Sequence, residues 1–572
     1  MPATAVVLLR LTILLLIVRA GFAQPPRSAD LVLHNGKIIT LDKSHSRVQA
    51  LAAREGRIVA VGTNAEVKRL IGPTTRVIDL RGKPAYPGFI EGHGHFLSLG
   101  RSLMSLDLKT ARNWDDVVAK VKAAVARSRR GEWIVGRGWH QEKWAPKPKD
   151  HVDGYPVHRE LSRVSPDNPV LLVHATGHAS FANARAMQLA GVDRNTPNPK
   201  GGLILKDNSG APTGVFRETA QSLVRRAYSR AQTSRSEKQR ADDDRKVFEL
   251  ATGECLSKGI TSFQDAGSSF ADVDLFKKLV VARRSPRLWV MLNESNARLR
   301  ERMKAYRMVG YGGHRLTVRA IKRMADGALG SHGALFLKPY DDLPSTSGLR
   351  VQSLAFIQET AVLAAKHDYQ LCVHAIGDRA NREVLDLFGV AFRSHPDRKD
   401  WRWRIEHAQH LHPRDIPRFA EQKVIASMQA NHATSDGPFV VRRLGKERAK
   451  TGAYVWRSLI DSGATIVNGT DAPVEDVNPI LSFHASVTRR MSNGKAFFPE
   501  QCMTREEALR SYTVNGAYGA FEEKLKGTLS PGKLADVVVL SADILTIPAD
   551  EIPKTNVLYT VIGGRVGYQR KH

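Results

Sequence analysis

Cysteine is scarce in this chain, with only Cys255, Cys372 and Cys502 among 572 residues. Their spacing matches neither a zinc knuckle nor a disulfide framework, which argues against a fold held together by cysteine-bound metal or by several disulfide bonds. One pair could form a disulfide in an oxidising compartment. Because Cys255 and Cys372 lie in apolar runs, we favour free, buried thiols instead.

Long hydrophobic runs are also missing. The longest candidate, residues 11–18, is far shorter than the roughly 20 residues that span a bilayer. Arg10 precedes it and small residues, ending with Ala23, follow it, which is the layout of a secretory signal. Arg19 interrupts this layout, and a retained N-terminal anchor is the alternative. We expect residues 1–23 to be a signal peptide, with a periplasmic or secreted product that has no stable membrane span after signal removal.

Acidic residues are outnumbered, with 57 Asp and Glu against 86 Lys and Arg, for a net charge of +29. Such a balance can indicate binding to nucleic acid or to anionic surfaces. Here the basic residues are spread along the chain, and the densest patches, at 127–130 and 225–245, resemble solvated helix faces. We therefore expect a basic, soluble surface and no nucleic-acid partner. The alternative predicts a steeply salt-dependent affinity for DNA.

Short apolar runs separated by turn residues occur near both ends of the chain, in residues 30–79 and again in "LADVVVLS" and "VLYTVIGGRVGY". This pattern of short apolar runs predicts a small β-sandwich domain built from residues 28–86 and 522–572. Asn35 and Gly36 form a dipeptide that favours a hairpin turn, so we expect a hairpin there.

The middle of the chain, residues 87–521, alternates strand-like and helix-like stretches, such as the helical patterns at 354–367 and 380–395. Repeated β-then-α order predicts parallel strands with right-handed crossovers, and active sites of such barrels lie where the strands end. Residues 106–236 are too many for one crossover. We expect them to form an insertion that packs over the barrel mouth.

Three side chains in apolar strand patterns suggest metal chemistry. His93 and His95 are two residues apart, so in a strand both imidazoles point to one side and can bind one metal ion. Lys322 is costly to bury as a cation. It either extends to the surface, or lies in the barrel and is carboxylated by carbon dioxide to an anionic, bridging ligand.

Three further candidates follow later apolar runs: His374, His407 and Asp471. Taken singly, each histidine is more often a core residue, and His410 competes with His407 but falls later, in the expected loop. Asp471 precedes Ala-Pro and suits a barrel mouth, although a helix cap or a turn residue fits as well. The order of all six residues on successive strand ends is more informative than any one of them.

With the segments "PGFIEGHGHF", "ADGALGSHGA", "VHAIGDRAN", "EHAQHL", "GTDAPVEDVNP" and "GTLSPGKLADVVVL", this order resembles the amidohydrolase superfamily, and within it amidohydrolase family 3, the YtcJ-like branch. The resemblance implies a TIM-like (β/α)8 barrel with one or two divalent metal ions, usually zinc. His93, His95, Lys322, His374, His407 and Asp471 would be the ligands, with Lys322 as the carbamate bridge. The family usually has Asp where this chain has Glu91, so we assign Glu91 no role.

These features predict an exported hydrolase of a small-molecule substrate. It would use metal-activated water to cleave a C–N amide-type bond other than a peptide bond, in an amide or an N-substituted formamide. Asp471 would act as the general base. Alternatives are hydrolysis of an ester, lactone or carbamate at the same site, or a non-catalytic exported binding protein. Related enzymes often associate, so a homodimer is possible.

Four residues are candidate substrate contacts: Trp139 and His178 in the expected insertion, Arg217 further along it, and His432. A purely structural role is at least as compatible with each of them.

Overall fold

The computed structural model describes residues 28–44, 46–233, 236–282 and 285–571. The predicted signal peptide, residues 1–23, lies outside these ranges. Within them, no helix combines the length and apolar character needed to cross a membrane. The thiols of Cys255, Cys372 and Cys502 are free, and the first two are buried.

Eight parallel strands form the central barrel, and neighbours along the chain are neighbours in the sheet. They are β8 (Phe89–Gly94), β17 (Ile260–Ser268), β18 (Arg287–Leu292), β20 (Leu316–Met324), β21 (Gln370–Ala375), β22 (Arg404–His407), β23 (Ile425–Gln429) and β24 (Ile466–Gly469). At the carboxyl ends, the Asp471 N–H donates to the His93 carbonyl at 2.7 Å and the His95 N–H donates to the Ala472 carbonyl at 2.7 Å. These contacts join the first and last strands, and the predicted TIM-like barrel is confirmed.

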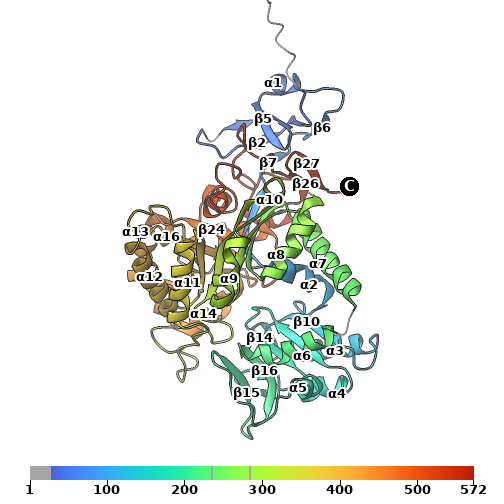
Figure 1. The fold of residues 1–572 in the computed structure, drawn as a ribbon, viewed down its shortest axis with the longest axis vertical. Coiled ribbons are helices and arrows are strands. Elements are labelled where there is room, and N and C mark those ends of the chain that lie inside the picture. The colour runs from blue at the N-terminus through green and yellow to red at the C-terminus, as the bar shows by residue number, and fades with distance from the viewer. Residues whose placement is uncertain (1–27, 45, 234–235, 283–284, 572) are drawn as a thin grey trace, which may run out of the picture.

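Helices such as α8 (Phe270–Leu279), α9 (Asn296–Tyr306), α11 (Leu354–Lys366) and α12 (Asp378–Arg393) surround the strands (Figure 1). Helix α11 begins where the Ser353 side chain accepts from the Phe356 N–H, a standard helix cap. The strands are almost entirely buried, because helices cover the outside of the barrel and side chains fill its inside. The main hydrophobic core lies between strands and helices.

Both ends of the chain contribute to a β-sandwich. One sheet has the order β5-β4-β1-β6 and the other β27-β26-β25-β7-β2-β3. The strands are β1 (Leu31–His34), β2 (Lys37–Ile39), β3 (Arg47–Val48), β4 (Ala50–Arg54), β5 (Arg57–Gly62), β6 (Arg76–Asp79), β7 (Pro84–Pro87), β25 (Val537–Leu540), β26 (Val557–Ile562) and β27 (Arg565–Gln569). Strands β7 and β25 pair antiparallel, and Leu31, Leu51, Ile38 and Val537 share one core. The predicted small β-sandwich is confirmed.

The hairpin predicted at Asn35-Gly36 is wrong. Strand β1 pairs with β4 and β6, whereas β2 pairs with β3 and β7, so the chain crosses from one sheet to the other at this turn. Asn35 has the positive φ of 54° that the dipeptide favours. Gly36 does not share this positive φ, and both edges of β1 are occupied by other strands.

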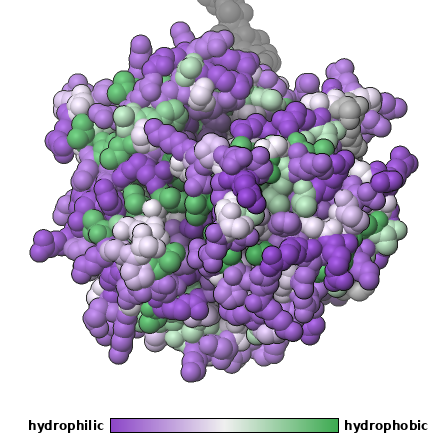
Figure 2. All heavy atoms as spheres, turned by 90° about the horizontal axis from the view of Figure 1, so that it is seen from below, coloured by the Kyte–Doolittle hydropathy of each residue, from purple (hydrophilic) through white to green (hydrophobic). Residues whose placement is uncertain are grey.

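The insertion contains a six-stranded sheet of its own, of order β15-β16-β14-β13-β10-β9. Its strands are β9 (Leu106–Asp107), β10 (Ile134–Trp139), β13 (Val170–His174), β14 (Ala179–Ala182), β15 (Gly202–Lys206) and β16 (Pro212–Glu218), and its helices include α3 (Trp114–Val125), α5 (Ala184–Ala190) and α6 (Gln221–Thr233). It lies on the side of the barrel opposite to the terminal sheets (Figure 1). The face seen from this side is mostly hydrophilic, with small scattered apolar areas (Figure 2).

Candidate metal centre

The six predicted ligands meet at the carboxyl ends of the barrel strands. His93 lies on β8, Lys322 on β20, His374 on β21 and His407 at the end of β22. His95 directly precedes helix α2 (Phe96–Met104), and Asp471 follows β24 by two residues. In a closed parallel sheet these ends form one rim, which is why residues far apart in the chain come together.

Asp471 lies at the centre of this group. Its Oδ1 atom is 3.1 Å from the Nε2 atom of His95 and 3.7 Å from the Nε2 atom of His93. The same His93 nitrogen is 3.3 Å from the Lys322 ammonium nitrogen. The side chain of His93 is fully buried, and that of His95 is 34% exposed. One nitrogen of His93 therefore faces both the carboxylate and the lysine.

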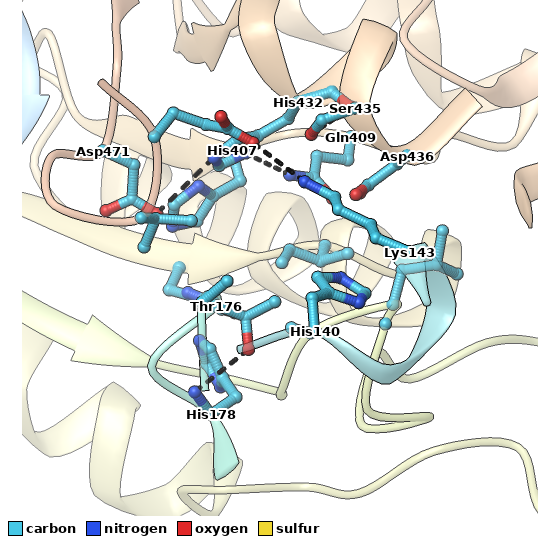
Figure 3. A pocket seen from close by; sticks show the side chains of 18 residues that line it. His140, Lys143, Thr176, His178, His407, Gln409, His432, Ser435, Asp436 and Asp471 are labelled. Carbon is cyan, nitrogen blue, oxygen red and sulfur yellow. Dashed lines mark hydrogen bonds and ion pairs between the residues drawn. The ribbon is translucent and has the colours of Figure 1, made fainter. Parts of the chain in front are cut away.

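The other two histidines complete the cluster. The ring centroids of His374 and His407 are 4.5 Å apart, and those of His407 and His93 are 4.7 Å apart. His432, predicted as a substrate contact, lies on α14 (Ala430–Leu444), and its Nε2 atom is 3.9 Å from Asp471 Oδ2 (Figure 3). His432 thus lies with the candidate ligands: atoms of His407, His432 and Asp471 come close enough to share one ion, as do those of His93, His95 and Asp471.

Charged and polar partners fix the orientation of two imidazoles. Glu406 contacts the Nδ1 atom of His93 and also forms a buried pair with Arg404, whose Nε donates to Oε1 at 2.7 Å. Gln429 Oε1 lies 2.7 Å from the Nδ1 atom of His407. With Nδ1 engaged in each ring, Nε2 is the nitrogen left for a ligand, which is the usual arrangement around protein-bound metals.

Electrostatics keep the cluster in forms that can act as ligands. Burial lowers the pKa of His93 to about 4, and the nearby Lys322 acts in the same direction. Burial also lowers the pKa of Lys322. For Asp471, burial alone would raise the pKa, but the contacts with His95, His407 and His93 hold it well below its usual range. The site therefore presents the neutral imidazole of His93 next to an ionised carboxylate.

Two adjoining pockets open beside the cluster and share His178, His374, His407 and Asp471 among their lining residues. The insertion supplies one wall, with His140, Thr176 and His178 facing the barrel residues in Figure 3. The His178 Nδ1 atom is 2.7 Å from Glu218 Oε2, and its ring centroid is 5.1 Å from that of His374. The insertion thus reaches the mouth of the barrel.

Trp139 and Arg217 line neither pocket. Trp139 is buried in the core of the insertion, where its indole N–H donates to the Leu172 carbonyl at 3.0 Å. A register shift in β10 between Arg137 and Trp139 breaks the alternation of the strand, so Arg137 lines a pocket and Trp139 does not. On β16, Glu218 lines the larger pocket, whereas its buried neighbour Arg217 lines neither.

A TIM-like barrel that carries imidazoles and a carboxylate on its carboxyl rim defines the class of metal-dependent hydrolases. The family model described as the amidohydrolase family matches residues 76–568, so the chain belongs to this family, as the resemblance predicted. A putative amidohydrolase, YtcJ, of Bacillus subtilis is 31% identical over 94% of this chain and 99% of its own length. An N-substituted formamide deformylase of Arthrobacter pascens is 28% identical, over 95% and 98%.

The fold agrees with the solved structure of an uncharacterized metal-dependent hydrolase from Pyrococcus furiosus. The TM-score is 0.69 and the sequence identity 28%, with 90% of this chain and all of that chain covered. The match spans far more than the barrel alone. This chain is therefore a metal-dependent hydrolase of the amidohydrolase family.

Proposed function

We propose that the protein hydrolyses a C–N amide-type bond, in an amide or an N-substituted formamide, with zinc as its metal. The observation that carries the proposal is the position of Asp471. Its buried Oδ1 atom has no hydrogen-bond partner in the described part of the chain, although two imidazole nitrogens lie 3.1 and 3.7 Å away. A buried carboxylate oxygen without a partner is costly, and a cation between these groups would satisfy it.

The residues present fit a zinc ion. His93, His95, His374 and His407 offer imidazole nitrogens and Asp471 a carboxylate, a donor set that suits a borderline metal such as Zn²⁺. The buried Nε2 atom of His432 likewise has no hydrogen-bond partner among the described residues.

Lys322 would hold the metal as a carbamate, which would supply an anionic ligand next to His93. Its side chain is 3% exposed and its amine nitrogen is 3.3 Å from His93 Nε2, a position that disfavours a bare ammonium group. A bridging anion there favours two ions rather than one.

When bound, such a metal lowers the pKa of a water ligand from about 15.7 to about 7 and polarises the substrate carbonyl. Asp471 accepts the proton that the attacking water loses and returns it to the leaving nitrogen. His178 lies across the pocket, where Glu218 fixes its ring, and it can donate a hydrogen bond to the substrate. The wall formed by the insertion limits the access of bulk water to these groups.

The choice of an amide-type bond is supported by the formamide deformylase relative, which matches nearly the whole chain. A panel of N-substituted formamides, other amides, esters, lactones and carbamates tests it with zinc-loaded protein. We expect the highest kcat/KM on a member of the first two groups and about one or two zinc ions per chain. Faster turnover of an ester, lactone or carbamate would refute the bond assignment. If the purified protein bound no zinc and hydrolysed no member of the panel, the result would favour a non-catalytic binding protein.

We also propose export, with removal of residues 1–23. The support is the order of Arg10, the short apolar run and the small residues before Gln24. N-terminal sequencing of protein recovered from the periplasm or medium of producing cells should begin at Gln24. Recovery of the uncleaved chain from the cell interior would contradict export.

A further inference from the structure

The larger of the two pockets has two arginine side chains on its wall that form no ion pair among the described residues. Arg137 lies on β10 and Arg225 on α6, both in the insertion, and they line the pocket that also contains Lys322 and Asp471. Arg137 is half-buried and Arg225 is exposed. Other arginines, such as Arg287 and Arg404 of the barrel, are instead paired with carboxylates, Arg287 with Asp536 at 2.7 Å and Arg404 with Glu406 at 2.7 Å.

Neutral groups hold the two arginines in place. Arg137 Nη2 donates to the Ala175 carbonyl at 3.1 Å. Arg225 Nη2 donates to the side-chain oxygen of Gln221 at 3.0 Å, and the amide nitrogen of Gln221 donates in turn to the Gly177 carbonyl at 3.0 Å. These contacts fix the guanidinium groups without neutralising their charge. Each guanidinium has five N–H donors, so most of them stay available to a ligand.

The carboxylates of the same pocket do not compensate these charges. Only Glu218 and Asp471 are present among its described lining residues. Glu218 is bound to His178, and Asp471 belongs to the metal cluster. Burial lowers the pKa of Arg137 to about 10; Asp471 opposes this shift and Arg225 adds to it. Both arginines line this one pocket, and nearby cations in a concave site attract an anion.

We propose that Arg137 and Arg225 form a carboxylate-binding subsite beside the metal centre, so that the substrate is an amide that also carries a carboxylate. The planar guanidinium matches a carboxylate with two parallel hydrogen bonds. Gln221 is a positioning residue that holds Arg225. The inference rests on the proposed function only for the amide part of the substrate, because the arginines would bind the carboxylate without any turnover.

The test measures binding of glutarate and of its monomethyl ester to the purified protein by isothermal titration calorimetry. Glutarate can place one carboxylate at the metal and the other at the arginines, whereas the ester retains only one. We expect glutarate to bind at least about tenfold tighter than the ester, the usual effect of one good charge-assisted contact. Arg137→Gln and Arg225→Gln should each remove most of this difference and leave the affinity for the ester nearly unchanged.

Arg226→Gln is the matched control, because Arg226 is the next residue on α6, is exposed and lines neither pocket. It changes the net charge equally and should leave both affinities unchanged. A wild-type protein that binds the ester as tightly as glutarate would overturn the subsite, and this result depends on no variant. Retention of the difference in the Arg137→Gln, Arg225→Gln double variant, shown to be folded by circular dichroism, would also overturn it.

The two proposals fail separately. Arginine-dependent binding of glutarate without hydrolysis of any amide would refute the proposed reaction and leave the subsite standing. Hydrolysis of amides with no preference for acids over their methyl esters would refute the subsite and leave the reaction standing.

Discussion

Glu91 joins the first and last strands of the barrel through Thr470. Its Oε1 atom accepts from the Thr470 N–H at 2.7 Å, and its Oε2 atom accepts from the Thr470 hydroxyl at 2.9 Å. Thr470 directly precedes Asp471, and Glu91 also accepts from the His93 N–H at 3.2 Å. The position at which the family usually has Asp therefore carries a residue that positions two candidate ligands.

Glu91→Ala should destabilise the protein and loosen the metal centre. It leaves two buried donors of Thr470 without their acceptor, which costs about 1–3 kcal/mol for each unsatisfied group. Differential scanning calorimetry should show a lower Tm, and metal analysis a lower content per chain after dialysis against a weak chelator.

Thr470→Val is the partial control for this variant. It removes the hydroxyl but keeps the N–H bond to Glu91, so its effect should be smaller on both measurements. If Glu91→Ala retained full metal content and the wild-type Tm, Glu91 would have no role in positioning the site.

Much of the site could be predicted because strand periodicity is a local property. His93 lies on a buried strand and His95 directly follows it, and the later candidates lie at the ends of other strands on the same rim of the barrel. Glu406 was missed because it directly precedes His407, and strand alternation places such neighbours on opposite faces. In the structure the strand ends there, and His407 has a φ of 78°, so both side chains face the metal cluster.

A local irregularity in a strand also explains why the candidate substrate contact Trp139 does not line a pocket. The bulge in β10 falls at Gly138, which has a φ of 109°, and it separates Arg137 from Trp139. A single irregular residue of this kind decides which side chain lines the pocket, and the apolar pattern of the strand does not reveal it. Likewise, the Asn35-Gly36 dipeptide predicts a hairpin, but the strands on either side of it pair with strands distant in the chain.

Asp471→Asn should separate metal binding from catalysis. The amide oxygen still resembles a ligand, but it is a much weaker base than the carboxylate that accepts the proton. We expect near-normal zinc content and a loss of kcat of about 10²–10⁴-fold, the usual contribution of a general base. Asp461→Asn makes the same chemical change at an exposed position and should have no effect. Near-normal turnover in the Asp471 variant would remove it from the role of general base.

Lys322→Ala tests the bridging carbamate. Loss of an anionic bridge should lower the metal content and reduce activity by more than the roughly 10–100-fold that residues behind the ligands contribute. Added formate or acetate should restore part of the activity, because a small carboxylate can occupy the space of the carbamate. Lys304→Ala, at an exposed position on α9, is the control. An unchanged metal content in Lys322→Ala would exclude the bridge.

The stability of the junction between barrel and β-sandwich should depend on one buried ion pair. Arg287 at the start of β18 binds Asp536, which directly precedes β25, through contacts of 2.7 and 2.9 Å. Both side chains are about 5% exposed or less. Asp536→Asn leaves the buried guanidinium without its counter-charge, which costs about 3–5 kcal/mol. Glu551→Gln, which removes an exposed pair with Lys554, should change stability by less than about 1 kcal/mol.

The stability difference between wild type and Asp536→Asn should depend on pH, and its direction shows whether the ionised Asp536 stabilises the folded protein. Burial alone would raise the pKa of Asp536, but Arg287 more than offsets this and holds the pKa below its ordinary value of 3.8. A depressed carboxyl pKa stabilises the folded state fully above the unfolded pKa, about 3.9, and this contribution is lost as the pH falls through the folded pKa. Urea unfolding of wild type and Asp536→Asn should therefore differ by a constant amount from pH 7 to about 5 and by less below about 4. A difference that grew on acidification would mean that Asp536 is protonated in the folded protein at neutral pH, and that Arg287 is held by its contacts with the carbonyls of Gly313 and His314 instead.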